Sequence, residues 1–306
     1  MSSPVIVARG LVKDYGRTRA LSGLDLEVKQ GEVYGFIGPN GAGKSTTIRV
    51  LMDLLRPTAG TVEVFGYAPA AGGPALRGRI GYLPGELALG GRVSAAEHLH
   101  HLASLRGGRG RDAIGPLAER FGLDLTRPVR TLSKGNKQKV GVIQAFMHDP
   151  ELLILDEPTS GLDPLLQHEF RDLLLEHAER GVTVFMSSHV LREVETVADR
   201  VAVIKEGRVV DVDSVTGLRR RAGQRVSMRF AAPPEAAEAE AIDGVERVSV
   251  DGDTLHCILH GEPDGLLKWA ARSRVVGLSA RDRDLEELFL DLYRNHGAAP
   301  EVGDAR

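Results

Sequence analysis

The sequence predicts an α/β fold with a mainly parallel sheet over about its first two thirds, followed by a small α+β domain. Short apolar segments at residues 33–37, 152–156 and 182–187 alternate with segments of helical periodicity. Strands that are buried on both faces of a parallel sheet have this near-continuous apolar pattern. At 306 residues the chain is also long for a single hydrophobic core, which favours two domains.

Two segments near the N-terminus predict strands of a different kind. Residues 24–29 alternate strictly between apolar and charged side chains, as half-exposed strands do. Residues 60–66 form a β-favouring segment that begins and ends with glycine. Later, residues 201–204 and 209–211 flank Glu206-Gly207, and this pattern predicts a hairpin.

The character of the chain changes near the arginine cluster at residues 219–221. From residue 225 to residue 278 the patterns predict the order β-α-β-β-α-β, and a final helix would place Leu285, Leu288, Phe289 and Leu292 on one face. We therefore expect a nucleotide-binding domain over residues 1–220, a ferredoxin-like accessory domain over 221–295 and a frayed tail over 296–306.

Composition narrows the class of protein. The net charge is −3, which gives no reason to expect nucleic-acid binding. The single cysteine, Cys257, excludes an intramolecular disulfide and fits a reducing compartment. The N-terminus has no signal-peptide pattern, and no apolar run approaches the ~20 residues that cross a bilayer. We expect a cytoplasmic protein whose contact with any membrane is through a partner.

Residues 38–46 have the spacing G-x-x-x-x-G-K-[ST] of a phosphate-binding loop. The glycines let successive backbone N–H groups turn toward one anion, Lys44 can reach the β- and γ-phosphates, and the Ser45 hydroxyl can bind Mg²⁺. A buried strand before the loop and a helix after it complete the required context. The expected nucleotide contacts in the loop are Gly38, Pro39, Asn40, Gly41, Ala42, Gly43, Lys44, Ser45 and Thr46.

A second candidate site follows the apolar strand at residues 152–156, which ends in two carboxylates. In open α/β sheets the carboxyl ends of the strands present the ligand-binding groups. Asp156 therefore suits Mg²⁺ alongside Ser45. Glu157 is placed to hold and deprotonate a water aimed at the γ-phosphate.

With these motifs in place, the chain resembles the ATP-binding subunits of ABC transporters over about residues 5–215. Residues 132–138 are similar to the family signature, residues 160–163 to the dimer-contact loop and residues 187–189 to the switch-histidine loop. Tyr15 stands where the family has an aromatic residue that stacks on adenine. The resemblance implies the ABC type of P-loop NTPase fold, with a helical subdomain and N-terminal antiparallel strands.

The resemblance also implies a mechanism. Two copies would enclose two ATP molecules, each between one phosphate loop and the signature of the other copy, and would drive a separately encoded membrane subunit. Lys44, Glu157 and His189 are then the expected catalytic residues, and Ser45 and Asp156 the expected Mg²⁺ ligands. The further expected ATP contacts are Tyr15, Ser133, Gly135, Asn136 and Asp163.

The sequence departs from the family pattern at two places. The signature has Lys134 and Asn136 where the family has glycine and glutamine, so retuned ATP binding is expected. Gly85 stands where the family has a glutamine that touches Mg²⁺ or the attacking water. Glu86, the next residue, is a hypothetical substitute for that glutamine.

Two further clusters have a structural and a functional interpretation. His98 and His101 share a helix face, which fits either a solvated or partner-facing helix or a metal site without an evident third ligand. The cluster Arg219, Arg220, Arg221 and Arg225 fits either a solvated linker or contact with anionic lipid.

The C-terminal part resembles the accessory domain of the drug-exporter branch typified by daunorubicin-resistance ATPases, and residues 284–290 carry this resemblance. It implies export of a drug-like or lipid-like substrate, with the protein held at the inner face of the plasma membrane by its membrane subunit. The alternative is an ABC-type ATPase that acts on ribosomes or nucleic acid. Such proteins usually have two cassettes or a long insertion, and this chain has neither.

Overall fold

The computed structural model describes residues 3–87, 91–283, 285–287 and 289. The chain divides into two compact units, Met1–Val212 and Asp213–Arg306. This division falls earlier than residue 220, so the arginine cluster at residues 219–221 groups with the second unit. The expected frayed tail at residues 296–306, as well as Leu288 and Leu292, lies outside the described residues.

The first unit is built on a six-stranded sheet in which β5, β6, β7, β3 and β8 are parallel to one another. All residues of β3, β6 and β7 are buried, as the apolar patterns predicted. The strand order places β7 between β6 and β3, and β9 follows β8 through a turn at Glu206 and Gly207, which both have positive φ. In sheet order the strands are β5 (Ile80–Leu83), β6 (Leu152–Asp156), β7 (Thr183–Ser188), β3 (Val33–Ile37), β8 (Arg200–Lys205) and β9 (Arg208–Ser214).

A second, antiparallel sheet joins the same hydrophobic core. It has the order β2 (Thr18–Lys29), β1 (Pro4–Tyr15) and β4 (Ala59–Val64). Its buried residues pack in one cluster with those of α1 (Lys44–Leu51) and of the central strands. Helix α2 (Pro69–Arg77) adds Leu76 to this cluster.

Helices α3 (Ala95–Leu105), α4 (Ile114–Arg120) and α5 (Lys134–Phe146) form a subdomain with a hydrophobic cluster of its own. Two 3₁₀ turns, Arg111–Ala113 and Val129–Thr131, connect these helices. Helix α3 begins with a capping box, which the spacing Ser94-x-x-Glu97 in the sequence predicts. The Ser94 hydroxyl accepts from the Glu97 N–H at 3.2 Å, and the Glu97 carboxylate accepts from the Ser94 N–H at 2.7 Å.

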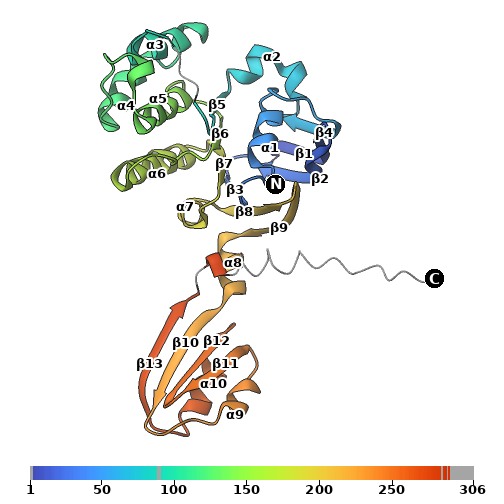
Figure 1. Ribbon diagram of the computed structural model, residues 1–306, viewed down its shortest axis with the longest axis vertical. Helices are drawn as coiled ribbons and strands as arrows, with labels where there is room; N and C mark the ends of the chain where they lie inside the picture. The colour runs from blue at the N-terminus through green and yellow to red at the C-terminus, as the bar shows by residue number, and fades with distance from the viewer. Residues whose placement is uncertain (1–2, 88–90, 284, 288, 290–306) are drawn as a thin grey trace, which may run out of the picture. The chain divides into compact units, whose positions relative to one another are not determined.

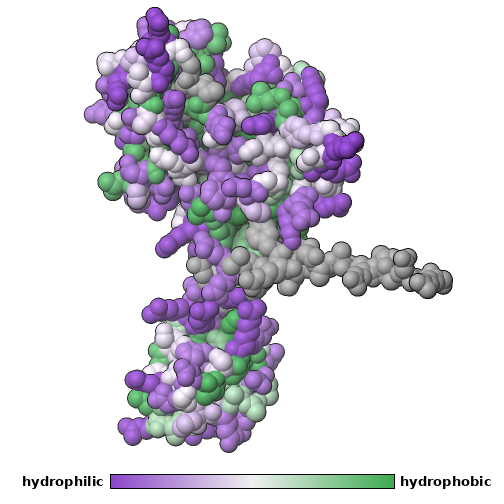
Figure 2. Space-filling view, viewed as in Figure 1, coloured by the Kyte–Doolittle hydropathy of each residue, from purple (hydrophilic) through white to green (hydrophobic). Residues whose placement is uncertain are grey.

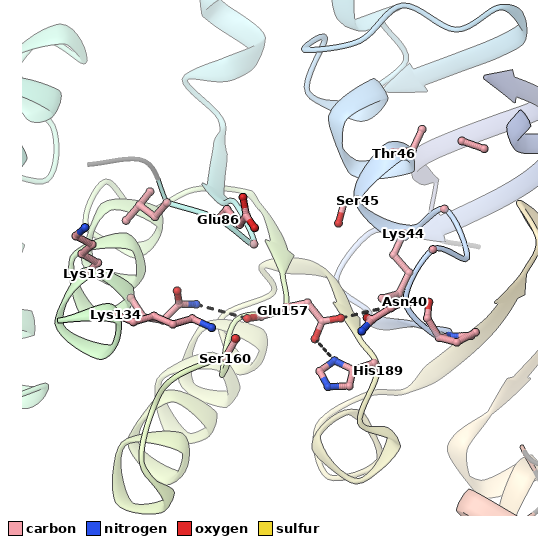
Figure 3. A pocket seen from close by; sticks show the side chains of 17 residues that line it. Asn40, Lys44, Ser45, Thr46, Glu86, Lys134, Lys137, Glu157, Ser160 and His189 are labelled. Atoms are coloured by element: carbon pink, nitrogen blue, oxygen red, sulfur yellow. Dashed lines mark hydrogen bonds and ion pairs between the residues drawn. The ribbon is translucent and has the colours of Figure 1, made fainter. Parts of the chain in front are cut away.

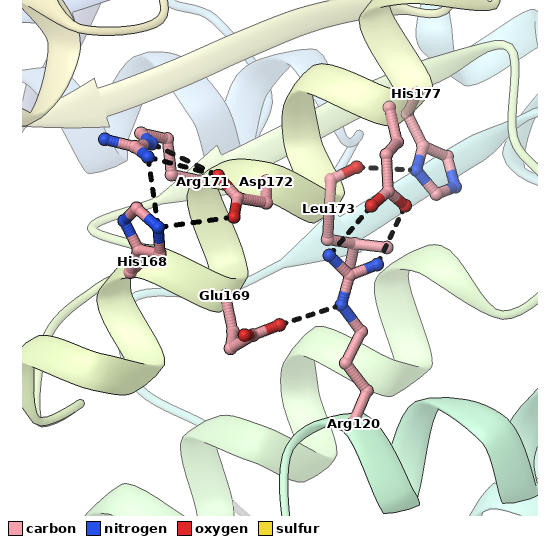
Figure 4. Close-up of polar contacts among 8 residues, drawn as sticks. Arg120, His168, Glu169, Arg171, Asp172, Leu173 and His177 are labelled. Atoms are coloured by element: carbon pink, nitrogen blue, oxygen red, sulfur yellow. Dashed lines mark hydrogen bonds and ion pairs between the residues drawn. The ribbon is translucent and has the colours of Figure 1, made fainter.

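Arg120, at the end of α4, joins this subdomain to α6 (Pro164–Glu179). Its Nε donates to Glu169 at 3.2 Å, and its two terminal nitrogens donate to Glu176 at 2.8 and 2.9 Å (Figure 4). These partly exposed ion pairs contribute less than about 1 kcal/mol each, so their main effect is on geometry. They set the position of α4 along α6. The short helix α7 (Leu191–Glu195) then leads from β7 to β8.

The second unit has a four-stranded antiparallel sheet in the order β11-β12-β10-β13. After helix α8 (Val215–Ala222) its elements follow the expected order β-α-β-β-α-β (Figure 1). Interlocked β-α-β units give this strand order. In chain order the elements are β10 (Gln224–Phe230), α9 (Ala236–Glu240), β11 (Val245–Asp251), β12 (Thr254–Leu259), α10 (Asp264–Ala270) and β13 (Val275–Asp282).

The face shown in Figure 2 carries mostly hydrophilic residues with smaller hydrophobic areas among them. In the arginine cluster, Arg221 pairs with Asp213 at 3.4 Å and Arg225 with Glu287 at 2.9 Å. None of the helices in the described part of the chain is both long enough and apolar enough to cross a bilayer.

One buried histidine makes the stability of the first unit depend on pH. His148 follows α5, is 2% exposed, and its Nε2 donates to the Ile80 carbonyl at 3.1 Å. Its Nδ1 has no hydrogen-bond partner among the described residues. Burial, with Arg106 as a further cause, lowers the pKa of His148 from 6.5 to about 4. The folded protein therefore holds this ring neutral.

Because the pKa of His148 is lower in the folded state, the unfolded chain binds a proton at this ring first as the pH falls. The free energy of unfolding is therefore undiminished above pH 6.5 and decreases as the pH falls toward 4. The loss should be on the order of 3 kcal/mol. His148→Gln retains a donor for Ile80 and removes the titration, so its unfolding midpoint in urea should fall less over this pH range. The exposed control His100→Gln should behave as the parent. Equal pH dependence in parent and His148→Gln would contradict this account.

Candidate functional site

Three neighbouring strands end together at one edge of the central sheet. Asp156 at the end of β6 lies opposite Ser187 of β7, and Ser188 of β7 lies opposite Ile37 at the end of β3. The phosphate loop follows β3, Glu157 follows β6, and His189 follows β7. The parallel order of the sheet thus brings the phosphate loop together with Glu157 and His189, which follow it by more than a hundred residues in the chain.

The phosphate loop runs from Gly38 into α1, which begins at Lys44. Gly43 has φ 111°, and a Cβ there would lie 2.8 Å from the Ala20 carbonyl oxygen, so no other residue fits without a shift. The Lys44 side chain is buried, and its Nζ donates to the Gly38 carbonyl at 2.6 Å and to the Pro39 carbonyl at 3.3 Å. A cation is therefore held inside a ring of backbone groups.

Asp156 is buried and held by its neighbour in the sheet. Its Oδ1 accepts from the Ser187 hydroxyl at 2.6 Å. On the other side, a Cβ at Gly85 would lie 3.1 Å from Asp156 Oδ2, so the backbone at Gly85 runs close to the carboxylate. A glutamine at position 85 would crowd Asp156, which gives a physical reason for the glycine.

Glu157 lies between two cationic or basic groups (Figure 3). Its Oε1 is 3.3 Å from Lys44 Nζ, and its Oε2 is 2.7 Å from His189 Nδ1. Its φ of 50° lies in the left-handed region, which costs a non-glycine residue about 1–3 kcal/mol and is frequent at functional sites. The Glu157 N–H donates to the Ser187 carbonyl and hydroxyl, both at 3.2 Å, and these contacts oppose that strain.

Ser187 and Gln138 lie in the segments similar to the switch-histidine loop and the signature, and they have positioning roles that the sequence analysis did not assign to them. Ser187 contacts both Asp156 and Glu157, as described above. Gln138, buried on α5, donates its side-chain amide to the Pro158 carbonyl at 2.8 Å. The signal for Gln138 is a polar side chain that is buried on α5. The signal for Ser187 is its position opposite Asp156 in the sheet.

Lys44, Gln138, Glu157 and His189 line a cleft of about 580 Å³. Figure 3 shows the side chains of Glu86, Lys134 and Lys137 on the side of the cleft across from the phosphate loop. Of the predicted residues, Gly38, Ala42 and Asp156 are buried behind the surface of the cleft. Those that line it are Pro39, Asn40, Gly41, Gly43, Lys44, Ser45, Thr46, Glu157 and His189.

Of the signature residues 132–138, Lys134, Lys137 and Gln138 line this cleft, whereas Ser133, Gly135 and Asn136 do not. Ser133 caps α5, and its hydroxyl accepts from the Asn136 N–H at 3.3 Å. Gly135 packs against the dimer-contact loop, since a Cβ there would lie 2.7 Å from the Gly161 carbonyl oxygen. Asp163 caps α6 by accepting from the Leu166 N–H at 3.0 Å. Ser133 and Asp163 are exposed, and neither of them lines the cleft.

Tyr15 also lies outside the lining of the cleft and is 44% exposed. The Lys13 ammonium is 5.3 Å from the centroid of its ring. The ring is therefore accessible to a flat ligand on the surface.

The oxygen donors of Ser45 and Asp156 are of the kind that Mg²⁺ prefers. No group of three or more His, Cys, Asp or Glu side chains that could hold a metal occurs among the residues the structure describes. His98 has a polar neighbour of another kind, since its Nε2 is 3.4 Å from the Gln144 side-chain oxygen.

The chain is similar to known proteins over most of its length. A family model described as ABC transporter matches residues 21–160. Daunorubicin/doxorubicin resistance ATP-binding protein DrrA of Streptomyces peucetius is 36% identical over 94% of this chain and 92% of its own. Bacitracin transport ATP-binding protein BcrA of Bacillus licheniformis is 40% identical over 72% of each chain.

A solved structure described as the ATP binding subunit of an ABC transporter superimposes with a TM-score of 0.66. It is 32% identical, and the match covers 71% of this chain and 92% of that one. The phosphate loop, the acidic end of β6 and these similarities show that the chain belongs to the ABC transporter family, as an ATP-binding and ATP-hydrolysing subunit.

Proposed function

We propose that this chain powers a separately encoded membrane subunit that exports drug-like or lipid-like molecules. The observation that carries the ATPase mechanism is the placement of Glu157 between Lys44 and His189 at the phosphate loop. The direction of transport is supported by the similarity to the daunorubicin/doxorubicin relative, which covers 94% of the chain and so extends over both units, whereas the match to the bacitracin relative covers 72% of the chain.

The phosphate loop would bind ATP by replacing contacts that Lys44 now makes. Its ammonium bonds two loop carbonyls and Glu157. Phosphate oxygens are stronger partners for this ammonium than neutral carbonyls. The backbone N–H groups at the start of α1, together with the positive end of its dipole, would complete the anion site.

Glu157 would act as the general base for the attacking water. When Lys44 turns to phosphate, one carboxylate oxygen of Glu157 becomes available, while His189 still holds the other at 2.7 Å. The freed oxygen can then orient the water and accept its proton. His189 would orient the carboxylate and, as in the family mechanism, contact the γ-phosphate.

Ser45 and Asp156 would hold Mg²⁺ together with the nucleotide. The ion would neutralise charge on the β- and γ-phosphates. Ser187 keeps Asp156 in a fixed orientation for this task. Glu86, across the cleft from the phosphate loop, is the candidate for the role of the missing glutamine (Figure 3).

The signature residues support a shared site between two copies. Ser133, Gly135 and Asn136 do not line the cleft of their own chain, and Ser133 is exposed at the N-terminal end of α5. Backbone N–H groups at such an end bind anions. In a second copy they would approach the γ-phosphate, with Asp163 in the adjoining loop and Tyr15 stacked on adenine. No nucleic-acid partner is part of this proposal.

The cytoplasmic location follows from the same proposal, with the chain bound peripherally at the inner face of the plasma membrane.

Glu157→Gln removes the base and keeps the shape of the site, so this variant should bind ATP and accumulate as a dimer. Light scattering with ATP and Mg²⁺ would measure the dimer. Glu151→Gln, at an exposed site before β6, is the matched control and should hydrolyse ATP like the parent.

Affinity purification of Glu157→Gln with ATP from solubilised membranes of its own cells tests the transporter role. A multi-span membrane protein in equal amount is the expected result. Monomers at saturating ATP would contradict the shared site, and ribosomal proteins without a membrane partner would contradict the transporter.

Ser187→Ala should weaken the use of Mg²⁺, because Asp156 and the Glu157 N–H both lose a hydrogen-bond partner. Loss of a hydrogen bond to a charged group costs about 1.5–3 kcal/mol, which corresponds to a rise of ten-fold or more in the Mg²⁺ concentration for half-maximal turnover. Ser104→Ala, whose hydroxyl bonds a carbonyl on the surface of α3, is the control. An unchanged Mg²⁺ requirement in Ser187→Ala would refute the role given to Ser187.

A further inference from the structure

One face of the second unit's sheet is covered by helices, and the other face is polar. Buried residues of β10, β11 and β12 form a core with residues of α9 and α10. Because side chains alternate between the two faces of a strand, the residues between these buried ones point to the opposite face. On β10 they are Arg225, Ser227 and Arg229, and none of the three is buried.

The register with β13 extends this polar face. Each of the three residues has a partner directly opposite on β13: Arg281 for Arg225, Ser279 for Ser227, and Gly277 for Arg229. Directly opposite residues of an antiparallel pair point to the same face. The pairing is regular up to Arg229, and the irregularity follows only at Phe230. A Cβ added at Gly277 would lie 3.8 Å from both Cβ and Nε of Arg229, so the Arg229 side chain extends over β13.

These six residues of β10 and β13, which we call the basic face, carry more positive charge than their surroundings neutralise. Arg229 and Arg281 are exposed, and neither makes an ion pair with another residue in the part of the chain that the structure describes. Arg225 pairs with Glu287 at 2.9 Å, but the same carboxylate also pairs with Arg283 at 2.9 Å. One carboxylate thus serves two arginines, and the basic face has a surplus of cations.

The acidic residues of this unit lie away from the basic face. Glu246 and Asp251 are on β11, which β12 and β10 separate from β13. Glu238 of α9 and Asp264 of α10 are on the helix-covered side, where they pair with Arg272 at 3.2 Å and with Lys268 at 2.8 Å. Charge is therefore divided between the two sides of the sheet, and an anionic surface would attract the basic face in preference to the other.

We propose that the basic face binds the phosphate groups of anionic phospholipids at a membrane surface, with Ser279 at the centre of the site. Ser279 is two residues from Gly277, which Arg229 covers, and two residues from Arg281, a separation of about 7 Å along the strand in each direction. Both guanidinium groups can reach a phosphate that accepts a hydrogen bond from the Ser279 hydroxyl. A guanidinium group matches phosphate by donating two parallel hydrogen bonds.

The composition of the basic face favours lipid over protein or nucleic acid. None of its six residues is aromatic or large and apolar. Protein interfaces depend on such residues as anchors, and single-stranded nucleic acids stack their bases on aromatic side chains. Electrostatic attraction to an anionic leaflet needs only cations near the surface. The inference rests on the proposed place of the chain at a membrane, where lipid binding would add a second attachment to that through the membrane subunit.

Cosedimentation of the full-length protein with vesicles tests this proposal. The parent should bind vesicles of phosphatidylcholine that contain phosphatidylglycerol, should not bind phosphatidylcholine alone, and should be released by high salt. The double variant Arg229→Gln, Arg281→Gln should bind roughly 25-fold more weakly, because each arginine near an anionic surface contributes about five-fold. The matched control Lys268→Gln, Arg272→Gln removes the same charge from the helix-covered side and should bind like the parent.

Substitution of Ser279 tests the centre of the site. Ser279→Asp places a carboxylate between the two guanidinium groups and should weaken vesicle binding, because this carboxylate would compete with phosphate for them. Ser279→Asn is the neutral control, and it should bind far more strongly than Ser279→Asp. Equal vesicle binding by these two variants would refute the site at Ser279.

The lipid site and the transporter role are separable by experiment. The basic face contains no residue of the cleft, so Arg229→Gln, Arg281→Gln should hydrolyse ATP like the parent in the absence of lipid. Failure of the parent to bind anionic vesicles would overturn the lipid site alone, as would parent-like binding by the double variant or binding to an acidic peptide or nucleic acid in place of vesicles. Absence of a membrane subunit in the purification described above would count against the transporter role, whatever the vesicles show.

Discussion

The hydrogen bonds of Ser187 hold the catalytic edge of the sheet together. This fully buried residue donates to Asp156, and both its hydroxyl and its carbonyl accept from the Glu157 N–H. It can do so because β7 lies between β6 and β3 in the sheet. The phosphate loop, the acidic pair and the switch histidine thereby share one small region, although each belongs to a different part of the chain.

The same arrangement explains the conformation of Glu157. A left-handed backbone is unfavourable for glutamate. The Glu157 N–H donates two hydrogen bonds to Ser187 of β7, and the Gln138 amide donates to the carbonyl of the next residue, Pro158; these contacts hold the backbone in place. This support directs the carboxylate toward Lys44 and His189. Before nucleotide binds, the two oxygens of the Glu157 carboxylate are thus already occupied by Lys44 and His189. We infer that nucleotide binding draws Lys44 from Glu157 to the phosphates while His189 keeps its contact, so the loop need not be rebuilt.

Local patterns in the sequence were sufficient to predict the phosphate loop, the buried strands and the capping box, since each depends on residues close in the chain. The contacts of Ser187 and Gln138 depend on strand order and helix packing, which no single segment determines. The proximity of Gly85 to Asp156 has the same origin. The sequence analysis placed the domain boundary at residue 220 because composition changes at the arginine cluster. That cluster lies inside α8, and the two units divide earlier, after Val212.

The claim that each ATP site is completed by a second copy is tested most directly by mixing two inactive variants. Lys44→Ala removes the phosphate-loop cation. Ser133→Asp keeps a good helix cap and places a negative charge where the γ-phosphate would approach. A mixed dimer would contain one site with both Lys44 and Ser133 intact, so the mixture should hydrolyse ATP well above the sum of the two variants measured alone. Turnover equal to that sum would contradict the account.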